Sequence, residues 1–142
     1  MAVDIRVAAE MDEERCLEMI ETLTGKTRAD GWSATFEALL GGSRGEVLVA
    51  DEDGTLLGVV TVSYNLAIRY AGEYAQLEEL IVDPAARGKS VGRLLVETAV
   101  QRARTRGCAE FGLYLLETTE HNRPFYQKYG FEYVGSEMRQ PL

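Results

Sequence analysis

The chain has 142 residues, of which 46% are hydrophobic and 27% are charged, a composition typical of a globular domain with one core. Its 15 basic and 23 acidic residues give a formal net charge of -8, which argues against sequence-independent binding to nucleic acid. No apolar run approaches the roughly 20 residues that span a bilayer, and the N-terminus lacks the pattern of a signal peptide, so we expect a cytoplasmic protein without membrane contact.

The first predicted elements in chain order are two helices. Apolar residues recur at mostly helical spacing over 11–23 and again over 33–40, and Gly25 and the pair Gly41-Gly42 supply the stops. The polar, glycine-containing stretch 24–31 is predicted to be a loop. A short extra strand before the first helix is left open.

The period then changes to that of strands. Residues 46–50 and 56–64 are rich in Val, Leu and Thr and flank the turn signal at 51–54, which predicts a β-hairpin. A third strand is predicted over 74–83, where Pro84 stops it.

The C-terminal half alternates helices and strands. A well-patterned helix begins at Ser90 and ends before Gly107, and it is followed by a strand over 108–116, a short helix over 122–129 and a last strand over 131–138. The order is α-α-β-β-β-α-β-α-β. We therefore expect one α/β domain over residues 1–142, with a mixed sheet.

Cysteine and histidine content limits the chemistry. Cys16 and Cys108 lie far apart and form no CxxC motif, so we expect two reduced, packed thiols. His121 is the only histidine, which excludes a histidine-rich metal site, and no metal is expected.

The most informative stretch is 77–95, where an apolar strand leads through a turn containing Arg-Gly-Lys into a helix. A helix N-terminus offers unpaired N–H groups and the positive end of a dipole, which favour an anionic ligand. A nucleoside-triphosphate P-loop would need glycine where Asp83 stands, and the dinucleotide fingerprint G-x-G-x-x-G has no match. What remains is R-x-x-[G]-x-G, filled by Arg87, Ser90 and Gly92.

The apolar strand, the V-x-P turn at 82–84 and this pattern together resemble the pyrophosphate-binding signature of the GNAT superfamily of N-acetyltransferases. The resemblance extends to 117–130 and to the order of elements, and it implies a GNAT-like fold whose mixed, mostly antiparallel central sheet is flanked by helices. One departure is Ser90, which replaces the first glycine of the signature. Because serine can cap a helix, we expect the loop to keep its shape.

The resemblance implies acetyl-CoA as the acyl donor. Backbone amides from Gly88 to Arg93 would bind its pyrophosphate, Arg87 and Lys89 would add positive charge, and the main chain of 80–82 would pair with the pantetheine arm like an added strand. Thr119 stands where many members have a cofactor-bonding asparagine, and Asn122 replaces the usual alanine; either caps the helix or bonds the pantetheine. The cofactor-binding residues expected in this way are Leu80, Ile81, Val82, Arg87, Gly88, Lys89, Ser90, Val91, Gly92, Arg93, Thr119 and Asn122. The alternative is an ordinary strand-turn-helix unit with exposed basic side chains.

Transfer to an amine requires removal of a proton from an alkylammonium group, which titrates near about 10. Glu78 and Glu79 interrupt an otherwise apolar strand, and regular alternation sends them to opposite faces. Family members often carry glutamate at the position of Glu78, so we favour Glu78 as the base, directly or through water, with Gln76 on the same face orienting the substrate. The alternative for these carboxylates is an ion pair on a solvated face.

The segment 122–131 resembles the family motif A-x-x-F-Y-x-x-x-G-F. Tyr126 matches the tyrosine that in many members points at the cofactor sulfur and acts as general acid, and its alternative role is aromatic packing under the cofactor. The loop residue His121 is expected to be exposed.

In this superfamily the acceptor is bound largely by the first helices, their loop and the strand ends, here 24–36 and 64–74. These segments mix acidic, basic and aromatic residues, so the amine stays open. The pattern over 72–92 is also similar to aminoalkylphosphonate N-acetyltransferases, which share a non-glycine residue at the position of Ser90. We expect acetyl transfer to the primary amine of a small molecule by direct attack in a ternary complex. A protein or peptide N-acetyltransferase and a non-catalytic acyl-CoA-binding domain stay open, and the resemblance is compatible with a homodimer.

Overall fold

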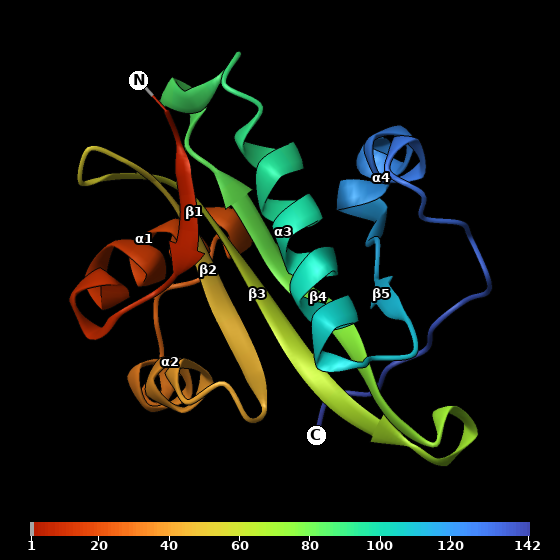
Figure 1. Cartoon of the computed structure of the whole chain (residues 1–142). Coiled ribbons are helices and arrows are strands. Elements are labelled where there is room, and N and C mark those ends of the chain that lie inside the picture. The colour runs from red at the N-terminus through yellow and green to blue at the C-terminus, as the bar shows by residue number, and fades with distance from the viewer. Residues whose placement is uncertain (1) are drawn as a thin grey trace.

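The computed structural model describes residues 2–142, which form a five-stranded sheet with helices on both faces (Figure 1). The strands follow the order β1-β2-β3-β4-β5 across the sheet; the first four are antiparallel, and β5 runs parallel to β4. This confirms the mixed, mostly antiparallel sheet. The elements are β1 (Asp4–Val7), α1 (Glu13–Thr24), α2 (Trp32–Leu40), β2 (Gly45–Glu52), β3 (Thr55–Ala67), β4 (Gly72–Val82), α3 (Val91–Arg106), β5 (Phe111–Leu113) and α4 (Arg123–Lys128).

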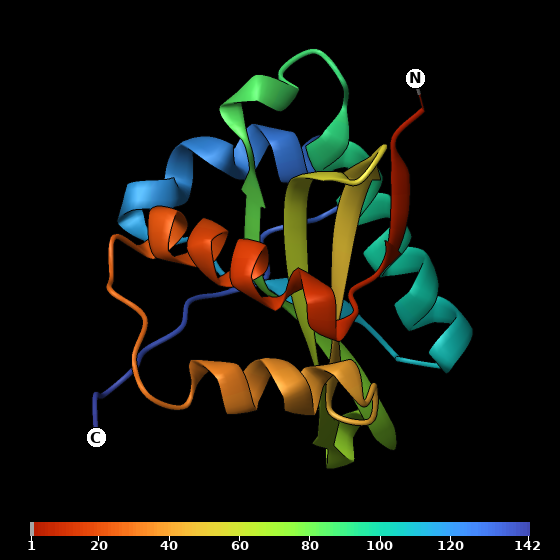
Figure 2. The same cartoon turned by 90° about the vertical axis from the view of Figure 1, so that its left-hand side faces the viewer.

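Helices α1 and α2 cover one face of the sheet, and α3 and α4 lie on the other (Figures 1 and 2). Side chains alternate between the faces along β2 and β3, and this alternation divides the core into two clusters. On the α1/α2 face the cluster includes Cys16, Leu17, Phe36, Val47, Val49 and Val59, and on the α3 face it includes Leu48, Val60, Val62, Leu95, Val96 and Ala99. Within residues 2–142, no helix is both long and apolar enough to cross a membrane.

Local sequence signals set the turns as expected. In the hairpin between β2 and β3, Asp53 and Gly54 have φ angles of 52° and 89°, as a type I′ turn requires. Asp51 stabilises this turn because its Oδ1 accepts the Gly54 amide at 2.7 Å. The first helix ends at Gly25, which has a φ of 70° and whose amide bonds to the carbonyl of Glu21.

The two ends of the chain differ most from the expected order. The short N-terminal strand that the sequence left open is present as β1. The predicted last strand over 131–138 is wrong, and the observed order is β-α-α-β-β-β-α-β-α. The physical reason is the short edge of β5, which spans three residues instead of 108–116, together with Gly135, which weakens the strand pattern. Side-chain contacts hold the exposed segment instead, with Arg123 stacked 4.9 Å from the ring centre of Tyr133.

Candidate active site

The turn between β4 and α3 begins at Asp83. Its carboxylate accepts the amide of Ala85 at 2.8 Å and so caps a single-turn 3-10 helix, Pro84–Ala86. Arg15 of α1 pairs with the same carboxylate at 2.6 Å. Asp83 therefore shapes the turn and joins it to α1, while its negative charge is balanced by Arg15.

Two residues of this turn adopt a left-handed backbone. Gly88 has a φ of 81° and Ser90 a φ of 57°. Ser90 occupies the N-cap position of α3, as expected, but its side chain makes no capping hydrogen bond. The role expected for its hydroxyl in capping is therefore wrong. A left-handed φ is also the reason why glycine suits this position better than serine.

The open hydrogen-bond donors of the turn lie at the start of α3. Amides at the first positions of a helix have no acceptor within it, and here they are the four amides from Ser90 to Arg93. The amides of Arg87 and Lys89 instead donate to carbonyls of the preceding 3-10 turn, at 3.3 and 3.2 Å. This helix start packs against α4: a Cβ atom at Gly92 would lie 3.6 Å from the Phe125 ring, which is an ordinary van der Waals distance.

Three cations surround these amides, and two already have carboxylate partners. Lys89 Nζ contacts both oxygens of Glu52 at 2.8 and 3.0 Å, and Arg93 pairs with Glu97 at 3.1 Å. Arg87 is exposed and, within residues 2–142, forms no salt bridge. Arg87 is therefore the cation of the turn that is free to meet an anionic ligand.

The edge of β4 beyond Leu77 faces no strand on the β5 side. Pairing between β4 and β5 covers only Ala75 to Leu77 against Phe111 to Leu113. The main chain of residues 80–82 therefore pairs with β3 on one side and leaves its other side without a strand partner. Figure 1 shows the chain leaving β5 toward α4, on the same side of the molecule as the start of α3.

A β-bulge in β4 changes which way its two glutamates point. Thr61 of β3 pairs with Glu79 and Val62 pairs with Leu77, so Glu78 is the extra residue. Val62 and Leu77 belong to the core cluster on the α3 face, whereas Ser63 donates to Glu78 Oε2 at 2.7 Å and Thr61 donates to Glu79. Both carboxyl groups thus lie on the α1/α2 face, and the predicted opposite orientation is wrong, because alternation does not hold across a bulge.

The two carboxyl groups differ in their surroundings. Glu78 is exposed, and Glu79 is partly buried. Burial raises the pKa of Glu79 above the usual value of a carboxyl group; the hydroxyl of Thr61 opposes this shift, and the negative charge of Glu78 adds to it. Gln76, which pairs with Ser63 in the ladder, lies on the same face, as expected.

Tyr126 projects from α4 into the core beside β4 and β5. Its ring makes edge contacts with Phe125 and Phe131, at centroid distances of 5.1 and 5.8 Å. Burial raises its pKa. Of the neighbouring candidates, Thr119 uses its hydroxyl within its own turn, accepting the Leu116 amide at 2.9 Å. Asn122 stands at the N-cap of α4 without a side-chain capping bond, and His121 is exposed as expected.

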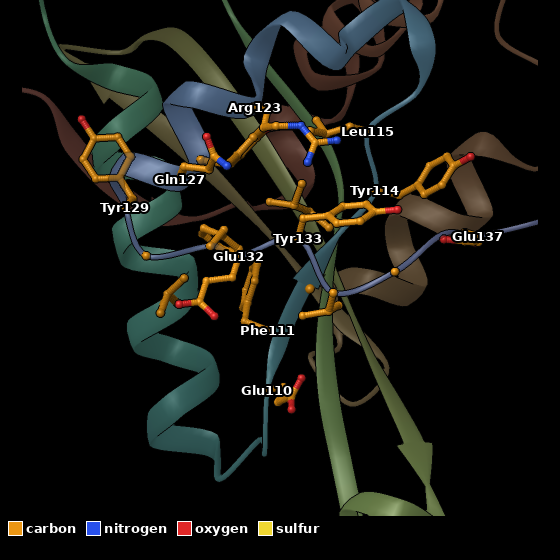
Figure 3. Close-up of a pocket in the computed structure, with 18 of the residues that line it drawn as sticks. Glu110, Phe111, Tyr114, Leu115, Arg123, Gln127, Tyr129, Glu132, Tyr133 and Glu137 are labelled. Carbon is orange, nitrogen blue, oxygen red and sulfur yellow. The ribbon is translucent and has the colours of Figure 1, made fainter.

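A cavity of about 800 Å³ lies elsewhere, between the end of α3, β5, α4 and the C-terminal segment. Figure 3 shows Phe111, Arg123, Gln127 and Tyr133 around it. Tyr126 is the one predicted site residue in its wall, so the cavity does not coincide with the β4–α3 turn. Among residues 2–142, no group of three His, Cys, Asp or Glu side chains is arranged to hold a metal ion.

The sequence reasoning missed the polar side of β3. Thr61, Ser63 and Asn65 alternate with the apolar or aromatic residues Val60, Val62 and Tyr64, and this alternation was the signal that could have revealed them. All three lie on the face that carries Glu78 and Glu79, where Asn65 Nδ2 donates to Ser63 Oγ at 3.0 Å.

Comparisons with known proteins agree with this geometry. The model of the acetyltransferase (GNAT) family matches residues 10–131. Glucosamine 6-phosphate N-acetyltransferase of Trypanosoma brucei brucei is 26% identical over 144 residues, which cover 99% of this chain and 96% of that protein. Glucosamine 6-phosphate N-acetyltransferase 1 of Oryza sativa subsp. japonica is 35% identical over 107 residues, which cover 72% of this chain and 62% of that protein.

Solved structures share the fold over the whole chain. The structure of AAC(6')-Iy, in complex with the bisubstrate analog CoA-S-monomethyl-acetylneamine, has a TM-score of 0.86 at 19% identity and covers 100% of this chain and 99% of that one. The family match spans the strand, the turn and both helices that carry the candidate site. The chain belongs to the GNAT family of acetyltransferases and is an N-acetyltransferase.

Proposed function

We propose that this enzyme transfers the acetyl group of acetyl-CoA to the primary amine of a small molecule, by direct attack in a ternary complex. The observation that carries the proposal is the pairing of two features at one place: four open amides at the start of α3, and the unpaired edge of β4 at 80–82. Amides at a helix N-terminus suit a pyrophosphate, and a free strand edge suits the amide groups of a pantetheine arm.

The side chains around these features support the same donor. Arg87 is free to add positive charge, and Lys89 and Arg93 can do so by exchanging carboxylate partners for phosphate. In this proposal Asn122, which is half-buried at the N-cap of α4, bonds the pantetheine arm. Thr119 would contribute by holding the turn that precedes this helix.

The reaction needs one group that helps to remove a proton from the acceptor amine and another that protonates the departing sulfur. Glu78 is exposed on the α1/α2 face and, in this proposal, receives the ammonium group of the acceptor and serves its deprotonation. Tyr126 lies on the opposite side of β4 and protonates the thiolate of the departing CoA. The sheet then stands between the two groups, with the thioester at the edge of β4.

The favoured acceptor is an amino sugar phosphate such as glucosamine 6-phosphate. The two relatives described above carry that substrate in their names. The residues around Glu78 support a polyhydroxylated amine, because Ser63, Asn65 and Gln76 place hydroxyl and amide groups on the same face as the carboxylate.

A thiol-release assay with acetyl-CoA and glucosamine 6-phosphate tests the function, with glucosamine, aminophosphonates, polyamines and peptides as comparison acceptors. We expect the highest kcat/KM with the amino sugar phosphate. Turnover with peptides alone would replace the small-molecule acceptor by a protein, and silence with every amine while acetyl-CoA binds would leave an acyl-CoA-binding domain.

Calorimetric titration with acetyl-CoA tests the donor site separately. We expect Arg87→Ala to weaken binding about tenfold, since one charge-assisted bond to phosphate contributes about 1.5 kcal/mol. Arg104→Ala on α3 is the matched control, because Arg104 is an exposed cation more than two turns beyond Arg93. Equal affinity of wild type and Arg87→Ala would remove Arg87 from the site.

We also propose a homodimer. The outer edge of β5 has no strand partner within residues 2–142, and the C-terminal segment exposes Tyr133, Val134 and Met138. Tyr133 and Val134 line the same cavity as Phe111 of β5. Light scattering across a concentration series measures the mass directly, and a monomer at every concentration would contradict this proposal.

A further inference from the structure

Proton removal from one amine needs one carboxylate, but the bulge in β4 brings two to the same face. Each has its own hydroxyl partner on β3. Thr61 Oγ1 accepts the Glu79 amide at 3.0 Å, which leaves the hydroxyl proton free to donate to the Glu79 carboxylate. Ser63 Oγ accepts from Asn65 Nδ2 and donates to Glu78 Oε2, so both hydroxyls are oriented as donors to carboxylates.

The two carboxyl groups are unequal in a way that separates their roles. Glu78 is exposed to solvent, whereas Glu79 is partly buried, and this burial raises the pKa of Glu79 above that of an exposed carboxyl group. Glu78 is the charged group that acts on Glu79. On α1, which packs on β4, Arg15 pairs with Asp83, and Glu14 and Glu21 pair with Arg28. The charge of Arg139, in the C-terminal segment, interacts with that of Glu78. Neighbouring carboxyl groups held in different environments commonly take different parts in one proton transfer.

Resting on the proposed function, we propose that Glu78 and Glu79 divide the work on the acceptor: Glu78 holds the ammonium group at the surface, and Glu79 behind it is the final acceptor of the proton. Thr61, Ser63 and Asn65 act through these carboxyl groups as positioning residues. Glu79 suits its part because a base works best when its pKa lies closer to neutral pH than that of an exposed carboxylate.

The step is balanced as follows. An N–H bond of the ammonium breaks, its electron pair stays on nitrogen, and an O–H bond forms on the Glu79 carboxylate. The neutral nitrogen attacks the thioester carbonyl, the C–N bond forms and the C–S bond breaks. The sulfur takes the proton of Tyr126, and the nitrogen returns its second proton to Tyr126 as the amide forms, through water. Glu79 then releases its proton to solvent, so an alkylammonium and a thioester give an amide, a thiol and one proton.

The test is the pH dependence of kcat and KM in E79Q and E78Q, assayed with an amine that wild type acetylates. We expect E79Q to lower kcat about 100-fold or more at neutral pH with little change in the KM of the amine. The difference in kcat between wild type and E79Q should shrink as the pH approaches the pKa of the amine, because more of the amine is then already neutral in solution. E78Q should raise the KM of the amine about tenfold or more, since it removes the charge that holds the ammonium.

Two further variants act on Glu79 through its neighbours. T61V removes the bond that lowers the Glu79 pKa, so the acid limb of the kcat profile should move to higher pH, and T61S should restore it. E78Q removes the charge that raises this pKa, so its acid limb should move to lower pH. Because the acid limbs of T61V and E78Q should shift in opposite directions, these two variants test the role of Glu79 even if E79Q does not fold. Titration of the Glu79 carboxyl carbon by NMR reports the same shifts without turnover.

A pH-independent loss in E79Q would overturn the division of work, as would a pH-dependent loss of kcat in E78Q with none in E79Q. Acid limbs of T61V and E78Q that stay at the wild-type position would do the same. If wild type acetylates no amine, the proposed function fails, whereas the NMR titrations of Glu79 in T61V and E78Q still measure the coupling between the two carboxyl groups.

Discussion

Replacing Ser90 by glycine should stabilise this enzyme, although serine is the residue that the chain carries. A non-glycine residue in the left-handed region costs about 1–2 kcal/mol, and Ser90 has a φ of 57°. Glycine loses more conformational entropy on folding, which takes back about 0.5–1 kcal/mol. No capping bond is lost, because the Ser90 side chain makes none to α3. The expected gain is therefore about 0.5–1 kcal/mol.

Urea unfolding followed by circular dichroism measures this gain, which corresponds to a rise in Tm of about 2–3 °C for a domain of this size. Ser90→Ala is the first control and should leave stability nearly unchanged, since it keeps the left-handed strain and removes only an unbonded hydroxyl. Gly88→Ala is the second control and should lose about 1 kcal/mol or more, because Gly88 has a φ of 81° and its Cβ would meet nothing within 4 Å, so the cost comes from the backbone alone. A clear loss of stability in Ser90→Gly, or a loss above about 1 kcal/mol in Ser90→Ala, would show that the serine hydroxyl holds the loop and would refute this reasoning.

Three further perturbations test separate parts of the molecule. Tyr126→Phe should lower kcat about 100-fold or more at unchanged affinity for acetyl-CoA, and a kcat within about twofold of wild type would assign Tyr126 to packing alone. Deletion of Glu78 removes the extra residue and lets β3 and β4 pair without a register shift, so the circular dichroism spectrum should be retained while acetyl transfer is lost; an unfolded product would show that the bulge is needed for pairing. Asp12→Asn should cost about 1–3 kcal/mol at pH 7, because Asp12 is buried and accepts bonds from Arg6 at 2.8 and 3.0 Å. The bond from Arg6 lowers the pKa of Asp12, so the stabilisation by the Asp12 carboxylate is fully present above the usual carboxyl pKa of about 4 and is lost as the pH falls through the lowered pKa. The difference in unfolding free energy between wild type and Asp12→Asn should therefore narrow at low pH in urea titrations. A difference that is independent of pH would contradict a role for the charge.

Features set by local chemistry were predictable from the sequence. The Asp-Gly pair at 53–54 readily adopts the positive φ angles that a two-residue hairpin turn requires, and the turn forms as expected. The apolar run before Pro84 and the helical period after Ser90 likewise locate the strand-turn-helix unit of the candidate site. The resemblance at Arg87, Ser90 and Gly92 then identified the family, which the comparison over residues 10–131 confirms.

Features that depend on pairing between distant segments were not predictable. The residues 131–138 have the composition of a strand, but a strand also needs a neighbouring edge, and the sequence does not reveal that β5 keeps only three paired residues. The backbone conformation of Ser90 was not predictable either: serine suits a helix cap, but here its φ of 57° belongs to the turn and its side chain makes no capping bond. Glu78 and Glu79 are the third case, because alternation assumes a regular ladder and a single extra residue cancels it.

That extra residue links the two halves of the proposed reaction. The bulge falls at Glu78, and the last pair between β4 and β5 is Leu77 with Leu113, so β4 changes on both of its edges at the same point. A bulge bends its strand and increases the local twist, which carries the following residues away from the direction of the neighbouring strand. In the proposed reaction, this insertion puts both glutamates on the α1/α2 face, where the amine would bind, at the point where the edge at 80–82 becomes open to the acyl donor. The amine and the thioester can then approach the same stretch of β4 from different sides, which is the arrangement that direct transfer between two bound substrates requires.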